Sequence, residues 1–368
     1  MSYAAAALVR SASLEASRRH GKREMHMADA LLSPALGGTM WAATAVTIAY
    51  CSRRLRNEAD DRRVPLMGVL GAFLFAAQMI NFSIPGTGSS GHLGGGLLLA
   101  MLLGPHAAFL VVASVLIVQA LFFADGGLLA LGCNIFNLGF FPAFIGYPIY
   151  RRLAGGTPGT PRTTVAAIAA AVVSLQLGAV AVVLQTVASG ISALPLGTFA
   201  LFMLPVHLAI GIVEGVVTAT VVTFVRATRP GILPGAAPSN RSVSGIVAAF
   251  AAVALALGGI GAWFASKNPD GLEWSITQIT GIDELDSPQT VLHASLAELQ
   301  RRAVMMPDYG FRQDGGPGAL PAGAPGTNNL NRPDGRLGTS LAGVLGGAIA
   351  LMLALLVGFA LQWKARPA

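Results

Sequence analysis

The sequence carries little charge. Only 11% of its 368 residues are charged, whereas 54% are hydrophobic. Soluble domains carry about 25% charged residues, so this balance argues against a soluble fold. Several apolar runs reach the roughly 20 residues that a bilayer-spanning helix needs. The composition therefore predicts an all-α polytopic membrane protein in a lipid bilayer.

Cysteine and lysine are also scarce. Cys51 and Cys133 lie inside apolar runs without C-x-x-C spacing, which argues against a disulfide framework and a thiolate metal site. The lysines are Lys22, Lys267 and Lys364, and none belongs to a G-x-x-x-x-G-K-[ST] phosphate loop. An H-E-x-x-H motif is absent too, so a membrane zinc protease has no support. We predict that the chain is not an enzyme and that any ATP hydrolysis comes from partner subunits.

Nine apolar segments are predicted to lie in the membrane. They cover about residues 35–51, 65–83, 92–104, 106–124, 128–150, 163–188, 198–225, 243–265 and 341–361. The third is short, and it either crosses the bilayer or is re-entrant or buried in protein. The net charge of +7 comes mainly from arginines at segment ends. We interpret it as a topology signal, with no nucleic acid as partner.

The arginine-rich loops predict an orientation. They lie at 52–64, 151–162 and 226–242, and the C-terminal tail is basic as well. All four share one side if the third segment crosses, and the positive-inside rule makes that side the cytoplasm. We therefore expect a multi-pass plasma-membrane protein with a cytoplasmic C-terminus and an extracytoplasmic segment 266–340. Met25-His26 and the loop that contains His92 then both face outward.

Residues 1–24 do not fit this orientation. Their basic residues would have to lie outside, and their apolar part is too short for a secretory signal and precedes the charges. We interpret the segment as an extension upstream of a start at Met25. The alternative is a cytoplasmic arm, which would invert the topology or alter the site.

Met25-His26 has a chelating pattern. If the chain begins at Met25, its α-amine, the His26 amide nitrogen and the His26 Nδ1 form two fused chelate rings in one plane, an arrangement that Ni(II) and Cu(II) favour. His92 is the candidate for a fourth nitrogen. A planar four-nitrogen site suits Ni(II) better than Co(II), and its affinity should fall as pH falls because protons compete for the nitrogens. Taken singly, either histidine has a simpler interpretation as a solvated or backbone-bonded residue.

Other polar side chains are candidates for supporting roles. Asp29 follows the chelating pair and is a candidate to orient an imidazole. His207 and Glu214 are seven residues apart on one helix face, where we expect a structural or coupling role. Asn134 and Asn137 are three residues apart. We expect them to bond between helices, and the alternative is that they hold the metal loop.

Four stretches occur in a characteristic order: Met25-His26 with 28–34, then 89–95 through Gly104-Pro105, then 132–139, then 207–215. Together they resemble the CbiM/NikM group, the nickel- and cobalt-capturing components of energy-coupling factor (ECF) transporters. The resemblance implies a bundle of about seven helices with Met25, His26 and His92 as metal ligands. It also implies a transmembrane coupling (T) subunit and cytoplasmic ATPases as partners. The typical family start reads Met-His-Ile-Pro-Asp-Gly, from which Met27, Ala28 and Ala30 depart.

The C-terminal part contains Pro269-Asp270-Gly271-Leu272-Glu273. This run resembles the signature of the PDGLE domain, a two-span accessory like the CbiN/NikN partners. We expect Asp270 and Glu273 to shape a turn. The predicted organisation is an extension at 1–24, a metal-capture domain at 25–228, a linker at 229–242 and a two-span accessory module at 243–368. We expect residues 266–340 to gate or promote loading of the metal loop.

Three functions remain in view. The favoured one is the substrate-capture component of an ATP-driven importer for Ni(II) or Co(II). A stand-alone secondary transporter or channel would need polar residues along a midplane path, yet Glu214 is almost the only carboxylate in the predicted spans. A sensor or scaffold would need a cytoplasmic output domain, which the sequence lacks. Metal uptake with and without ATPase partners distinguishes the three.

Overall fold

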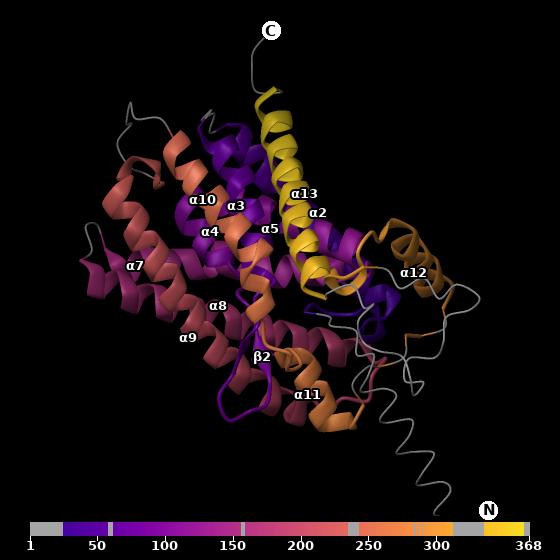
Figure 1. Ribbon diagram of the computed structural model, residues 1–368. Coiled ribbons are helices and arrows are strands. Elements are labelled where there is room, and N and C mark those ends of the chain that lie inside the picture. Colours follow the sequence, from indigo (N-terminus) through magenta and orange to yellow (C-terminus); the bar gives the residue numbers. More distant parts are fainter. Residues whose placement is uncertain are drawn as a thin grey trace, which may run out of the picture.

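The computed structural model describes residues 25–57, 62–155, 159–234, 243–282, 285, 287–288, 290–311 and 335–363. Helices dominate the described part (Figure 1), which confirms the predicted all-α class. The first part of the chain forms α2 (Pro34–Arg56), α3 (Arg63–Gln78), α4 (Gly96–Leu103), α5 (Pro105–Val118), α6 (Leu131–Ile135), α7 (Tyr147–Ala154), α8 (Thr160–Ser189) and α9 (Leu196–Thr228). The later part forms α10 (Ser244–Gly259), α11 (Gly271–Thr280), α12 (Val291–Ala303) and α13 (Gly335–Trp363).

Short elements connect these helices. The 3-10 turns are η1 (Asp29–Leu31), η4 (Pro230–Ile232), η5 (Gly261–Phe264) and η6 (Pro307–Tyr309). Two π-helical segments, η2 (Gln119–Phe123) and η3 (Phe136–Gly146), continue α5 and α6. The strands β1 (Phe82–Ser83) and β2 (Ser90–Gly91) pair antiparallel. The predicted extension at 1–24 and most of the linker at 229–242 lie outside the described residues.

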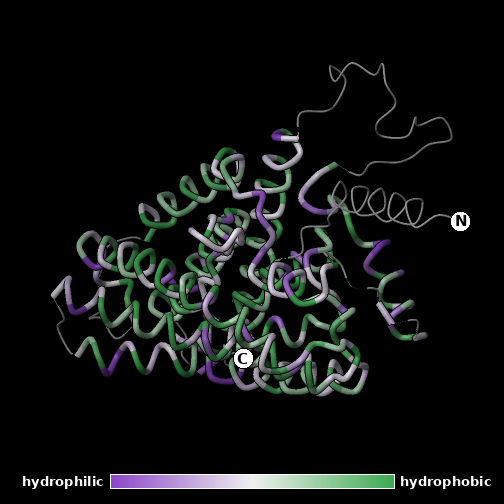
Figure 2. The backbone as a smooth tube through the Cα atoms, turned by 90° about the horizontal axis from the view of Figure 1, so that it is seen from below, coloured by the Kyte–Doolittle hydropathy of each residue, from purple (hydrophilic) through white to green (hydrophobic). Residues whose placement is uncertain are grey.

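Four helices of the described part are long and apolar enough to cross a membrane: Pro105–Phe123, Thr160–Ser189, Leu196–Thr228 and Gly335–Trp363. Apolar side chains such as Leu184, Leu201 and Leu356 are exposed on three of them, as expected of surfaces that face lipid. In Figure 2, the colours of hydrophobic residues cover most of the helices. The protein is therefore a polytopic membrane protein, as predicted. The remaining predicted spans include α3 and α10, which are apolar but shorter, at 16 residues each.

The third predicted segment is a short buried helix. The eight residues of α4 are all buried, and they rise about 12 Å against a hydrocarbon core of about 30 Å. Glycines in left-handed conformation flank it, Gly95 with φ +71° and Gly104 with φ +85°. The helix is thus enclosed by protein instead of crossing alone. The predicted orientation of the chain in the membrane assumed that this segment crosses. That orientation therefore stays a prediction.

Two irregular points shape the region around α6. η2 ends at Phe123, and the next residue, Ala124, has a φ of 57° that turns the chain out of the helix immediately before Asp125. After α6 the helix widens into η3, which contains Pro142 and therefore lacks one backbone donor. Such π-helical widenings are frequent at functional sites.

The C-terminal helices pack directly on the first part of the chain. α10 and α13 lie against each other and against α3 (Figure 1). Small residues permit this close approach, since a Cβ on Gly258 would lie 3.1 Å from the Gly343 backbone. Gly346 of α13 likewise lies against Phe75 of α3. The long helices α8 and α9 form a second packed pair.

Candidate metal site

The segment 25–32 precedes α2 and lies inside the protein. Asn134 of α6 holds its main chain, because the Asn134 Oδ1 accepts from Met27 N–H at 3.1 Å and its Nδ2 donates to the Met27 carbonyl at 3.2 Å. Asp29 Oδ1 accepts from Ala130 N–H at 2.9 Å. Among the described residues, Asp29 thus bonds to the backbone, and this loop, which we call the metal loop, is fixed against residues 126–134.

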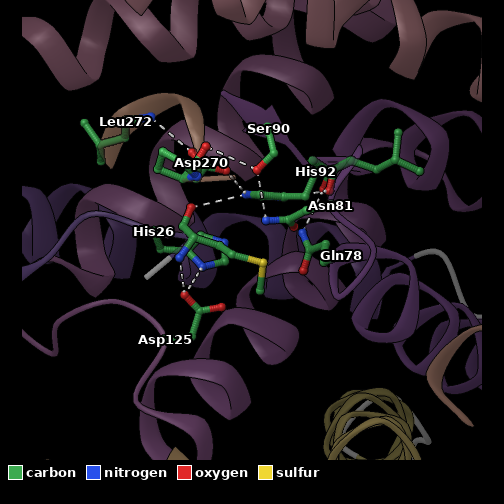
Figure 3. A network of polar contacts seen from close by, with 12 residues as sticks. His26, Gln78, Asn81, Ser90, His92, Asp125, Asp270 and Leu272 are labelled. Carbon is green, nitrogen blue, oxygen red and sulfur yellow. Dashed lines mark hydrogen bonds and ion pairs between the residues drawn. The ribbon is translucent and has the colours of Figure 1, made fainter. Parts of the chain in front are cut away.

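His26 is buried beside a carboxylate. Its Nδ1 lies 3.1 Å from Asp125 Oδ1, and the same oxygen accepts from Met25 N–H at 2.8 Å. The His26 Nε2 is buried and has no hydrogen-bond partner among the described residues. Gly126 permits this approach, since a Cβ there would lie 2.9 Å from the His26 Cβ. Figure 3 shows His26 directed at Asp125.

The surroundings of Asp125 favour its ionised form. Burial acts to raise its pKa, but the His26 imidazole, the Tyr309 hydroxyl and the Met25 N–H together hold that pKa below its ordinary value. The Tyr309 hydroxyl donates to Asp125 Oδ2 at 2.6 Å. Burial, with Asp125 adding to it, raises the pKa of Tyr309 well above its ordinary value, so the hydroxyl stays a donor. Tyr309 belongs to the C-terminal module, which therefore reaches the metal loop through Asp125.

His92 comes to the same place from the segment after β2. The centroids of the His26 and His92 rings are 5.4 Å apart. The His92 Nε2 lies 3.2 Å from the Met25 carbonyl oxygen and 3.6 Å from Asp270 Oδ2. The structure thus brings together Met25, His26 and His92, which are the predicted ligands.

The glycine-rich segment after His92 is anchored by Glu214. The two carboxylate oxygens of Glu214 accept from Gly94 N–H at 2.8 Å and from Gly95 N–H at 3.1 Å. On the other side, Gln78 Nε2 donates to the Gly94 carbonyl at 3.1 Å. Glu214 therefore positions the ligand segment from α9 and stays buried without a cationic partner among the described residues.

The other predicted polar residues divide between two tasks. Asn137 bonds between helices, since its Nδ2 donates to Gln185 Oε1 of α8 at 2.8 Å. His207 Nδ1 lies 2.8 Å from the Met203 carbonyl in its own helix. Asn134, in contrast, holds the metal loop.

A cavity of about 80 Å³ unites these residues. Its lining includes Met25, His26, His92, Asn134, Asn137, His207, Glu214 and Asp270. A second cavity, of about 150 Å³, is lined by Asp29, Glu273 and His293 among others, and His26 borders both. Leu272 of the C-terminal module lines both cavities as well.

Side chains alone do not complete a metal site in the part of the chain that the structure describes. No group of three or more His, Cys, Asp or Glu side chains is arranged there to hold a metal ion. A metal bound between the two histidines would need further donors. The main-chain nitrogens nearest in sequence to the His26 imidazole are those of Met25 and His26.

Sequence reasoning missed Asp125 and Tyr309. Asp125 lies in Ala124-Asp125-Gly126-Gly127, between two apolar runs, and a lone acid flanked by glycine at the end of a span is a signal that could have been used. Tyr309 carries no such signal, because its partner is far away in the sequence. Asp270 was expected only to shape a turn, and it does cap α11, but it also faces His92.

Fold and site together define a polytopic membrane protein with a buried histidine site. Residues 26–232 match the family described as CbiM, cobalt uptake substrate-specific transmembrane region, and residues 244–363 match the PDGLE domain. The chain therefore belongs to the CbiM family and is a metal transport protein with a PDGLE domain at its C-terminal end.

Relatives carry both metals in their names. A metal transport protein of Haloquadratum walsbyi is 39% identical over 57% of this chain and 93% of its own length. A fused nickel transport protein NikMN of Archaeoglobus fulgidus is 35% identical over 62% of this chain and 75% of its own length. The cobalt transport protein CbiM of Sorangium cellulosum is 34% identical over 57% of this chain and 94% of its own length.

Proposed function

We propose that this chain is the substrate-specific component of an ATP-driven ECF importer, which binds Ni(II), or Co(II), at the outer face and delivers it inward. Family membership supports metal transport. The observation that carries the proposal is the meeting of His26 and His92 in one buried cavity, with ring centroids 5.4 Å apart. Histidine is the commonest neutral nitrogen ligand at physiological pH.

The proposed ligands are the Met25 amine, the His26 amide nitrogen and Nδ1, and the His92 imidazole. Met25 N and His26 Nδ1 already converge on one point, because both lie within about 3 Å of Asp125 Oδ1. A metal ion that took this point would displace one carboxylate oxygen. Four nitrogens in a plane favour nickel over cobalt.

Residues around the ligands are proposed to hold and couple the site. Asn134 holds the metal loop, and Glu214 holds the segment after His92. Asn137 of η3 and His207 of α9 line the same cavity, where they would contact a metal ion that moves inward. Asp29 would act indirectly, by fixing the loop to Ala130.

The proposal includes partners and a place in the cell. ATP hydrolysis would come from cytoplasmic ATPase subunits and reach this chain through a transmembrane coupling subunit. The site would face outward in the plasma membrane, the C-terminus would be cytoplasmic, and residues 266–340 would be extracytoplasmic. The C-terminal module is the proposed accessory domain, from residue 243 onward.

Uptake of radiolabelled nickel into cells that lack their own nickel transporters tests this proposal. We expect uptake that requires this chain, the coupling subunit and the ATPases together, and that is lost in His26→Ala and His92→Ala. His106→Ala is the matched control. The His106 ring packs against Tyr50 and Phe144, so this substitution should leave nickel uptake unchanged. Full uptake by this chain alone would instead support a stand-alone transporter.

A further inference from the structure

The PDGLE signature lies next to His92. Ser90, in β2, donates from its backbone N–H to the Pro269 carbonyl at 2.8 Å, and its hydroxyl donates to the Asn268 carbonyl at 2.9 Å. Ser90 also forms a parallel bridge with Asp270. The signature is thereby added to the small sheet two residues before His92, so its register relative to the imidazole is fixed by main-chain bonds.

The two oxygens of Asp270 face different partners. Oδ1 accepts from Leu272 N–H at 3.1 Å and caps α11, whereas Oδ2 lies 3.6 Å from His92 Nε2. The Asp270 side chain is only 8% exposed. Helix capping does not require the charge, because Asn caps a helix as well as Asp. Capping α11 therefore does not explain why residue 270 is an aspartate that faces the His92 imidazole.

The neighbours of Asp270 in the signature place it there. Gly271 lies against α9, where a Cβ would come within 2.7 Å of Val206 Cγ1 and 3.4 Å of His207 Cε1. Leu272 is buried and lines the same cavity as His92. A larger residue at 271 would therefore require Val206 or the signature segment to shift. Figure 3 shows Asp270, Ser90 and His92 as one connected group.

We propose that Asp270 is a positioning residue for His92, so that the PDGLE signature of the C-terminal module completes the surroundings of the metal. This inference rests on the proposed function above and names a residue that acts through a ligand. The carboxylate holds the ring toward the Met25 carbonyl and places a negative charge beside the incoming cation. Histidines that bind metals commonly donate the N–H of their other ring nitrogen to a carboxylate. Asp270 faces Nε2 of His92, which leaves Nδ1 for the metal. Losing such a carboxylate typically weakens metal binding about 10–100-fold.

The test is a calorimetric titration, with nickel chloride, of the chain that begins at Met25. Asp270→Asn keeps the cap and the size of the side chain but removes the charge, and we expect nickel to bind about 10–100-fold more weakly. Glu273→Gln is the matched control, since it removes the same charge one turn along α11, and we expect it to bind nickel like the parent. Asp270→Ser keeps a capping oxygen and serves as the second variant if Asp270→Asn fails to fold.

Rescue by a carboxylate separates positioning from a general structural effect. If the charge of Asp270 acts on His92, Asp270→Glu should bind nickel more tightly than Asp270→Asn. Parent-like affinity in Asp270→Asn, or equal losses in Asp270→Asn and Asp270→Glu, would overturn this inference alone. Absence of nickel binding by the parent chain would overturn the proposed function and this inference together.

Discussion

Glu214 shows how a single buried carboxylate organises the site. It accepts one backbone N–H on each oxygen, from Gly94 and Gly95, and so fixes the turn that follows His92. Two acceptors on one side chain match two adjacent donors that would otherwise be buried without partners. The residue thus has a defined task even without touching the metal.

Glu214→Gln should weaken this anchor. The amide has one acceptor oxygen and one NH₂ donor, so one backbone N–H would face another donor. We expect a loss of about 1–3 kcal/mol in the free energy of unfolding. We also expect weaker nickel binding, measured by chemical unfolding in detergent and by calorimetry.

Glu298→Gln is the control for this substitution. It removes the same charge from exposed pairs with Arg301 and Arg302, where stability should barely change. Equal behaviour of the two variants would contradict the anchoring role of Glu214.

Among the elements, the apolar helices were predictable and the irregular segments were not. Hydropathy located most of the helices but missed α11 and α12, which lie in the polar segment 266–340, and the single run predicted at 128–150 forms α6, η3 and part of α7. It could not locate the π-helical widening at η3, which depends on packing around Pro142 and not on composition. The closeness of His26 and His92 was expected from the motifs, whereas the link from Asp125 to Tyr309 joins distant segments without any local pattern.

Gly343→Val should disrupt the contact between α10 and α13. A Cβ at Gly343 would collide with the backbone of Gly258, which cannot rotate away. Overpacking of this kind costs about 1–3 kcal/mol, so the melting temperature in detergent should fall.

Gly259→Val provides the matched control for the helix contact. A Cβ at Gly259 meets nothing within 4 Å, so the same substitution should leave the melting temperature close to that of the parent. A fall of equal size in both variants would show that the α10–α13 contact does not depend on Gly343.

For the whole molecule, the C-terminal module encloses the metal loop. His293 Nε2 of α12 lies 3.0 Å from the Leu32 carbonyl, and Gln300 Nε2 donates to the Gly126 carbonyl at 2.8 Å. Tyr309 adds the bond to Asp125. The part that matches the CbiM family and the part that matches the PDGLE domain therefore both contribute residues to one site.

Tyr309→Phe should loosen the metal loop. The substitution removes only the hydroxyl that bonds to Asp125, and hydrogen bonds to charged groups contribute about 1.5–3 kcal/mol. We expect amide hydrogen exchange in residues 25–32 to become about tenfold faster or more. Tyr50→Phe, at an exposed hydroxyl on α2, should leave this exchange unchanged. Unchanged exchange in Tyr309→Phe would contradict the enclosing role.

In the proposed site, main-chain nitrogens of Met25 and His26 combine with His92 to bind nickel. The most direct measurement is nickel calorimetry on two purified chains, one that begins at Met1 and one that begins at Met25. We predict tight binding only in the chain with a free amine at Met25, and loss of that binding in His26→Ala and in His92→Ala. Equal binding by both chains would contradict the amine ligand, and binding that survives both histidine substitutions would contradict the site itself.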